Sequence, residues 1–296
     1  MRRTVLGLIG VGVIGAAAAW VLTAPSLRHS EAVAGLTGDP VAGEAVFWAA
    51  GCASCHMVPG SVGEAELVLA GGLAFPSAFG TFYAPNISTD AAEGLDGWTA
   101  AEVAGAIMDG VSPLGAHYYP ALPYNAYNKM QPQDAADLIA YLGTLPADAT
   151  PSKSHDVGFP FNIRRTLGGW KLLFGSDDWV LTEAATPQVE RGRYIAESLA
   201  HCAECHTPRN ALGGLDHSRW LAGAPNPDGK GNIPNITSGK LEWSEAEIVE
   251  YLTSGFTPEY DSVGGAMVHV VENMSRLPES DRAAVAAYLK AVPAVP

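Results

Sequence analysis

The sequence predicts an all-α protein built from two tandem copies of one small helical unit, preceded by an apolar N-terminal segment. Two observations lead to this fold class. A pentapeptide of the pattern Cys-x-x-Cys-His occurs twice, and the residues around both copies can be aligned with each other. The rest of each copy has helical periodicity with capping signals and few strand patterns, while 33 glycines and 21 prolines favour ordered loops between short helices.

Length and composition exclude several classes of protein. The 296 residues suit about two domains, and a hydrophobic content of 48% excludes a disordered chain. The 31 acidic residues outnumber the 17 basic ones, which gives a net charge of −14. This charge argues against nucleic acid as a partner and favours docking onto a basic protein surface. Acidity that only keeps the protein soluble is the alternative.

Residues 1–26 are predicted to form a membrane anchor or a signal segment. Arg2 and Arg3 precede an uncharged and mainly apolar run from Thr4 to Ser26. About 20 such residues reach across a bilayer, and the run exceeds the roughly 7–15 residues of a signal-peptide core. We therefore expect an uncleaved anchor, with a cleaved signal peptide as the alternative. Both alternatives export the body of the protein to the periplasmic side of the bacterial inner membrane.

The exported part is expected to contain two similar domains. A tether at residues 27–40 leads into the first domain at 41–146, an interdomain linker covers 147–187, and the second domain spans 188–296.

Each domain is predicted to hold three helices. The first runs into the pentapeptide and has a glycine near its start, Gly43 or Gly192. The second follows an N-cap residue, Thr99 or Ser244, with acidic residues in the first turn. The second helices are expected to stop at Gly110 and Gly255. The closing helices are expected over Asp134–Leu145 and Ser280–Ala291.

The pentapeptides are predicted to attach c-type haem. The two thiols of each lie about one helical turn apart, so each can form a thioether with one vinyl group of a haem. The adjacent histidine can give an imidazole nitrogen to the iron. The thiols are Cys52, Cys55, Cys202 and Cys205, and the iron-binding histidines are His56 and His206. The chain contains no further cysteine for a disulfide, a zinc site or a nucleophile.

Two other kinds of site also use Cys-x-x-Cys pairs. A thioredoxin-like redox pair would need a βαβ pattern nearby. A zinc or iron–sulfur site would need both pairs close together in sequence, whereas these are far apart and each is followed by histidine. Haem attachment explains both copies best, so we expect two haem c groups.

Several further stretches resemble a known family. The repeated Pro-Asn-Ile-Ser/Thr turns and the closing helices that end in Tyr-Leu resemble class I cytochrome c domains. A narrower resemblance rests on Tyr119-Pro120-Ala121-Leu122-Pro123-Tyr124, Phe159-Pro160-Phe161-Asn162-Ile163-Arg164 and Cys205-His206-Thr207-Pro208-Arg209-Asn210. These stretches are similar to the cytochrome c subunits of membrane-bound bacterial dehydrogenases for alcohols, gluconate and sugars. Members of that group typically have three haem motifs and this chain has two, so the resemblance leaves the electron donor open. Similar subunits also accompany molybdenum hydroxylases.

The resemblance also implies the second axial ligands. In class I cytochromes c this ligand is usually a methionine in the loop before the last helix. Met267 is expected to bind the second haem iron, whereas Met274 in the same loop is expected in the core. Met130 is expected to bind the first haem iron, with His117 as the alternative, and Met108 is expected in the core.

These expectations describe a dihaem electron carrier that is not an enzyme by itself. It would take electrons from a periplasmic or membrane dehydrogenase and pass them to a quinone, an oxidase or a soluble cytochrome. The alternative is a dihaem enzyme such as a peroxidase, which needs one haem with an open or displaceable ligand position. Because the distal ligand of the first haem, Met130 or His117, is not settled, the peroxidase alternative stays open.

Overall fold

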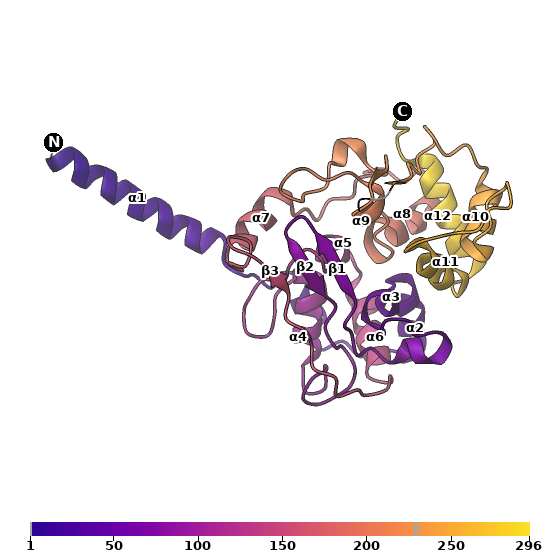
Figure 1. Ribbon diagram of the computed structural model, residues 1–296, viewed down its shortest axis with the longest axis horizontal. Coiled ribbons are helices and arrows are strands. Elements are labelled where there is room, and N and C mark those ends of the chain that lie inside the picture. Colours follow the sequence, from indigo (N-terminus) through magenta and orange to yellow (C-terminus); the bar gives the residue numbers. More distant parts are fainter. Residues whose placement is uncertain (1, 228, 230) are drawn as a thin grey trace.

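The protein is described by a computed structural model that covers residues 2–227, 229 and 231–296. A long N-terminal helix, α1 (Arg2–Leu22), projects from a body of two mainly helical halves (Figure 1). The side chains of the predicted basic flank, Arg2 and Arg3, lie outside the described part. Among the described residues, no helix combines the length and the apolar character that crossing a bilayer requires.

The first half consists of helices joined by long loops, with a small sheet beside them. Its helices are α2 (Pro40–Ala49), α3 (Cys52–His56), α4 (Ala100–Ala104), α5 (Tyr124–Tyr127) and α6 (Pro132–Leu142). A π-helical turn at Gly105–Asp109 extends α4, and 3-10 turns lie at Ser30–Ala32 and Gly63–Leu67. The antiparallel strands are β1 (Ala74–Ser77), β2 (Gly80–Tyr83) and β3 (Asp156–Val157). Because β3 pairs with β2, the segment that follows the first half folds back onto it.

The second half repeats this helical arrangement. Its helices are α8 (Pro187–Tyr194), α9 (Ala203–His206), α10 (Glu245–Ser254), α11 (Met267–Ser275) and α12 (Glu279–Ala291). A π-helical turn at Ile195–Leu199 extends α8, a 3-10 turn lies at His217–Arg219, and β4 (Ala224–Pro225) pairs with β5 (Asn232–Ile233). In sequence α7 (Thr166–Phe174) lies between the halves, and in space it lies near the root of α1 (Figure 1). The predominance of helix confirms that the protein is mainly α-helical, whereas neither small sheet was predicted.

Each half is closed by the same crossing of its first and last helices. Helix α2 crosses α6 at Gly43, where a Cβ would lie 1.9 Å from the carbonyl oxygen of Asp137. Helix α8 crosses α12 at Gly192, where a Cβ would lie 1.9 Å from the carbonyl oxygen of Ala284. Only a residue without a Cβ lets the two backbones approach this closely.

The predicted caps of the middle helices are confirmed. The hydroxyls of Thr99 and Ser244 each accept a hydrogen bond from the backbone N–H three residues on. The carboxylates of Glu102 and Glu247 accept from the N–H of the cap residue in return, which completes a capping box in both halves. The predicted ends of these helical segments are glycines in the left-handed conformation, Gly110 (φ 57°) and Gly255 (φ 77°).

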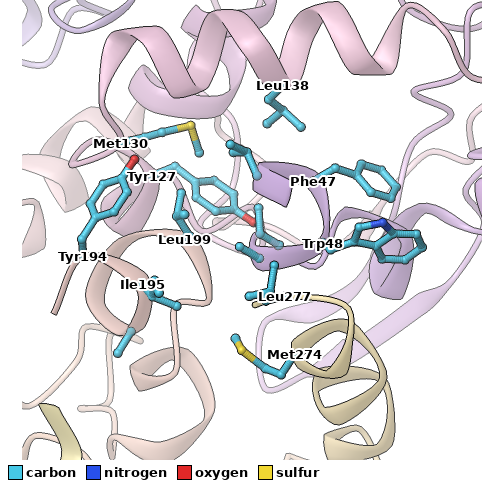
Figure 2. Packing of buried hydrophobic residues seen from close by; sticks show 14 of the residues in the cluster. Phe47, Trp48, Tyr127, Met130, Leu138, Tyr194, Ile195, Leu199, Met274 and Leu277 are labelled. Carbon is cyan, nitrogen blue, oxygen red and sulfur yellow. The ribbon is translucent and has the colours of Figure 1, made fainter. Parts of the chain in front are cut away.

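One hydrophobic core runs through both halves (Figure 2). It includes Phe47, Trp48 and Leu138 from the first half and Ile195, Leu199 and Met274 from the second. A polar link joins the halves beside it. The Tyr194 hydroxyl accepts a hydrogen bond from the N–H of Gln131, 3.1 Å away, and donates to the Asp134 carboxylate. The halves therefore form one packed body.

The segment that follows α1 packs against the first half. The Asp109 carboxylate accepts hydrogen bonds from the backbone N–H groups of Arg28, His29 and Ser30, each at 3.0 Å. Ser30 and Val33 are buried. The part of the predicted tether nearest to α1 therefore holds a defined position on the body.

Candidate functional site

The first pentapeptide forms the short helix α3. Gly51 precedes it in the left-handed conformation, with φ 65°, which turns the chain sharply from α2 into the motif. The Nδ1 atom of His56 lies 2.8 Å from the carbonyl oxygen of Pro85, and the His56 carbonyl accepts a hydrogen bond from the N–H of Gly71 at 2.7 Å. These two bonds fix the position and the ring orientation of the histidine.

The second pentapeptide has the same surroundings. His201 precedes it with a positive φ of 39°. The Nδ1 atom of His206 lies 2.8 Å from the carbonyl oxygen of Pro234, and the His206 carbonyl accepts from the N–H of Gly223 at 2.7 Å. The repeat seen in the sequence therefore extends to individual hydrogen bonds.

The carbonyls that orient these histidines belong to the two Pro-Asn-Ile-Ser/Thr turns. The Asn86 side chain donates from Nδ2 to the carbonyl oxygen of Asp148 at 2.7 Å. The Asn235 side chain donates from Nδ2 to the carbonyl oxygen of Val295 at 2.9 Å. In each half the turn is thus tied to the chain that follows the last helix, which immobilises the carbonyl that the histidine uses.

The two histidines are suited to bind a metal through Nε2. A backbone carbonyl can only accept a hydrogen bond. Its contact with Nδ1 therefore places the ring hydrogen on Nδ1 and leaves the Nε2 lone pair free. Among the described residues, neither Nε2 has a hydrogen-bond partner. Burial lowers the pKa of both His56 and His206, and the carbonyl contacts only partly oppose it. Both rings are therefore neutral near pH 7, as a metal ligand must be.

Protein atoms surround the thiols, but the four cysteines are not fully buried. Burial raises the pKa of Cys52 and Cys202 to about 12 and that of Cys55 to about 11. Yet Cys52, Cys55 and Cys202 remain half-exposed and Cys205 is exposed. Many protein atoms therefore surround each thiol, although the cysteines keep some access to solvent. Two thiols on one helical turn and an imidazole with a free Nε2 fit a covalently attached haem in both halves.

The two candidate sites lie close to each other. Two causes raise the pKa of Cys55: burial, which is the larger, and the charge of Cys205. The two thiols therefore interact across the boundary between the halves. The Asn273 side chain, in α11, donates from Nδ2 to the hydroxyl of Ser54 at 2.9 Å, inside the first pentapeptide.

The predicted distal ligands occupy different surroundings. Met130 is almost fully buried just before α6 and lies in the shared core with Tyr127 (Figure 2). Met267 begins α11 and is half-buried at the edge of the core, whereas Met274 and Met108 lie inside it. Nothing in the described contacts joins Met130 to His56 or Met267 to His206, so both assignments stay predictions.

His117, the alternative ligand in the first half, is engaged elsewhere. Its Nε2 lies 3.0 Å from the carbonyl oxygen of Thr23 at the end of α1. Its Nδ1 is buried and has no hydrogen-bond partner among the residues that the structure describes. Only Nδ1 could therefore reach a metal without breaking the contact with Thr23.

Sequence reasoning gave no role to His201, which the structure places at the centre of the boundary between the halves. Its ring packs against the ring of Tyr127, with centroids 5.5 Å apart. The Tyr127 hydroxyl donates to the carbonyl oxygen of Ala50, two residues before the first pentapeptide, at 2.8 Å. No sequence pattern indicates this contact, because it joins residues from different halves.

The cytochrome c family model matches residues 40–146 and 189–293. This chain belongs to the cytochrome c family. It is 55% identical to a dihaem cytochrome c-type protein of Cereibacter sphaeroides over the full length of both chains. It is 37% identical to the fructose dehydrogenase cytochrome subunit of Gluconobacter japonicus, over 83% of this chain and 51% of that protein. It is also 34% identical to a nicotinate dehydrogenase subunit of Pseudomonas putida, over 86% of this chain and 21% of that one.

These similarities confirm the predicted cofactors and the general function. The chain carries two covalently bound haem c groups and transfers electrons. The relatives give no support to the dihaem peroxidase alternative. The chain spans only about half of the fructose dehydrogenase subunit and about a fifth of the nicotinate dehydrogenase subunit.

Proposed function

We propose that this chain accepts electrons from a dehydrogenase, as its cytochrome subunit or its electron acceptor, and passes them to the respiratory chain. The observation that carries the proposal is the similarity, over more than four-fifths of the chain, to cytochrome subunits named for fructose, alcohol and gluconate dehydrogenases. The acceptor would be a quinone, an oxidase or a soluble cytochrome. The excess of acidic side chains favours a basic docking surface on a protein partner.

In this proposal each half holds one haem through the same set of atoms. The thioethers are formed by the sulfurs of Cys52 and Cys55 in the first half and of Cys202 and Cys205 in the second. The iron-binding nitrogens are Nε2 of His56 and His206, and the distal ligands are the sulfurs of Met130 and Met267. The bound haem supplies a one-electron change at its iron.

The protein residues would contribute orientation, burial and proximity. The carbonyls of Pro85 and Pro234 hold the two imidazole rings by their Nδ1 atoms, which increases the basicity of Nε2 toward iron. The contact between the halves at Tyr127 and His201 would hold both haems at a constant separation. A constant separation favours rapid electron exchange between them.

We propose the same division of the chain as the sequence suggests. Residues 41–146 and 188–296 would be the two cytochrome c domains, and 147–187 the linker between them. Residues 27–40 would connect the body to the segment 1–26, an anchor or signal that places the protein on the periplasmic side of the inner membrane. The matched regions of the family model and the basic, apolar start of the sequence support this division.

Oxygen uptake by membranes would test the proposed partnership. Membranes from the source organism are compared with membranes that lack this chain, using alcohols, gluconate, fructose and nicotinate as separate substrates. Uptake with one of these substrates should be lost and should return when the chain is restored, while uptake with NADH stays unchanged. Unchanged uptake with every dehydrogenase substrate would overturn the proposal.

A further inference from the structure

An open hollow on the first half is lined by basic and neutral polar groups. It encloses about 720 Å³, its open mouth included, beside β3 and the start of α7. Its lining residues are Tyr119, Ser152, Lys153, Ser154, His155, Val157, Asn162 and Arg164. No carboxylate of the described residues lines it, although acidic residues outnumber basic ones 31 to 17 in the whole chain.

The two cations of the hollow have no acidic partner. Within the described residues, neither Lys153 nor Arg164 has a carboxylate oxygen within 4.0 Å. Arg164 is held in place by its Nη1, which donates to the carbonyl oxygen of His117 at 3.0 Å, and by stacking over the Tyr119 ring at 4.1 Å. Lys153 is exposed, and its Nζ lies 5.7 Å from the centre of the Tyr83 ring.

A third donor faces the same space. The Nδ1 atom of His155 accepts a hydrogen bond from the N–H of Tyr83 at 3.1 Å, which leaves the ring hydrogen on Nε2. Burial and then the charge of Arg164 lower the pKa of His155, so its surroundings are positive rather than negative. Between Ser152 and Arg164 the sequence contains one acid, Asp156. It does not line the hollow, because alternate residues of a strand point to opposite faces.

The hollow adjoins the first haem attachment site. The His56 ring is held by the carbonyl of Pro85. The next residue, Asn86, donates its backbone N–H to the hydroxyl of Ser152 at 2.9 Å, and Ser152 lines the hollow. A charge bound there would therefore lie close enough to the first haem to influence it.

We propose that this hollow binds a carboxylate, with Lys153, Arg164 and His155 as its donors. Charged donors hold carboxylates by short hydrogen bonds, and a concave surface without acids in an acid-rich chain selects an anion over a cation. The carboxylate has two possible sources. It is either a propionate of the haem attached at Cys52 and Cys55 or a carboxylate from outside the chain.

The test uses the complete dihaem protein and two matched variants. Lys153→Gln removes an exposed charge inside the hollow, and Lys240→Gln removes an exposed charge outside it. Midpoint potentials of both haems are measured by spectroelectrochemistry at low ionic strength. Acetate binding is measured by calorimetry on the same samples.

If a propionate occupies the hollow, Lys153→Gln lowers the midpoint potential of one haem by more than Lys240→Gln does. The reason is that the charge of Lys153 disfavours oxidation of the haem iron, and the variant lacks this charge. Acetate then does not bind saturably. If the carboxylate comes from outside, acetate binds saturably to the wild type and to Lys240→Gln. Lys153→Gln then weakens binding by about two- to fivefold, as expected for one exposed charge pair. Equal potentials in both variants together with no saturable acetate binding would overturn the proposal.

Discussion

The ring of Tyr127 packs edge-on against the ring of His201, with centroids 5.5 Å apart and planes at 75°. Tyr127 precedes the last helix of the first half, and His201 precedes the haem-attaching cysteines of the second half. Asn273, which precedes the last helix of the second half, in turn donates to Ser54 of the first pentapeptide. Each half therefore covers the haem attachment site of the other, and this reciprocal contact holds the two sites together.

Tyr127→Phe should destabilise the protein while keeping the ring that packs against His201. The variant loses the hydrogen bond from the hydroxyl to the Ala50 carbonyl, which should cost about 0.5–1.5 kcal/mol of unfolding free energy. Chemical denaturation of the dihaem protein measures the change. Tyr260→Phe, at an exposed tyrosine, is the control and should have no effect. Equal stability of both variants would show that the hydrogen bond from Tyr127 to Ala50 does not stabilise the fold.

Gly43→Ala and Gly192→Ala should both destabilise the protein. A methyl group at either position would lie 1.9 Å from a backbone carbonyl oxygen of the facing helix, so the two helices must move apart. Overpacking of this kind typically costs about 1–3 kcal/mol, which should lower the melting temperature by several degrees.

Gly264→Ala is the matched control for these two variants. A Cβ there meets no atom within 4 Å, and its φ is not in the left-handed region. Its melting temperature should stay the same or rise slightly, because alanine restricts the unfolded chain. A fall as large as that of Gly43→Ala would mean that the crossing geometry is not the cause.

Local sequence signals predicted the parts of the fold that depend on neighbouring residues. The capping boxes at Thr99 and Ser244 need only a partner three residues on, and the structure contains both. The closing helix of the first half, expected over Asp134–Leu145, lies at Pro132–Leu142. It begins two residues earlier than expected because proline favours the first turn of a helix, and it ends three residues earlier, before Gly143.

Contacts between distant residues left no such signal. Strand β3 is only two residues long and pairs with β2, more than 70 residues earlier in the chain. A strand this short has no alternating pattern of apolar and polar residues from which it could be predicted. The ring contact of His201 depends on how the two halves pack. The attachment motifs were readable because covalent haem binding imposes a short fixed spacing, whereas the distal ligand can come from any residue that the fold brings near.

The link between the segment after α1 and the body should weaken as pH rises through the range in which His29 titrates. His29 Nδ1 lies 2.8 Å from a carboxylate oxygen of Asp109, and Nε2 lies 3.5 Å from one of Asp177. The bond to Asp109 outweighs burial and raises the pKa of His29. Because the pKa of His29 is higher in the folded than in the unfolded state, protonated His29 stabilises the fold fully at pH values below the unfolded pKa of about 6.5. This stabilisation is lost as the pH rises through the pKa of His29 in the folded state.

Asp109 itself should not contribute to that change. Burial raises its pKa, but hydrogen bonds from His29 and Ser30 outweigh burial and hold the pKa well below its ordinary value. Its stabilisation is present above the unfolded value of about 3.9 and is lost only in strong acid. Hydrogen exchange at the Arg28–Ser30 amides, corrected for intrinsic rates, should therefore show protection that falls as the pH rises above about 6.5. His29→Gln should abolish this slope, whereas His269→Gln, at a more exposed histidine paired with Glu272, should keep it.

Replacing the predicted distal methionines one at a time should identify the ligand of each haem. A methionine bound to ferric haem iron gives a weak far-red absorption band, so Met130→Leu and Met267→Leu should each remove the contribution of one haem. Leucine has nearly the volume of methionine, so the cost in stability should stay below about 1.5 kcal/mol. Each variant should also bind carbon monoxide after reduction at one haem, because an axial position becomes free.

Met274→Leu is the matched control, because Met274 lies in the core. It should keep the far-red band of both haems and bind no carbon monoxide. If Met130→Leu leaves the far-red band of the wild type unchanged, Met130 is not the ligand of the first haem. A double variant Met130→Leu, His117→Gln would then separate the remaining cases, because carbon monoxide binding only in the double variant would assign the position to His117.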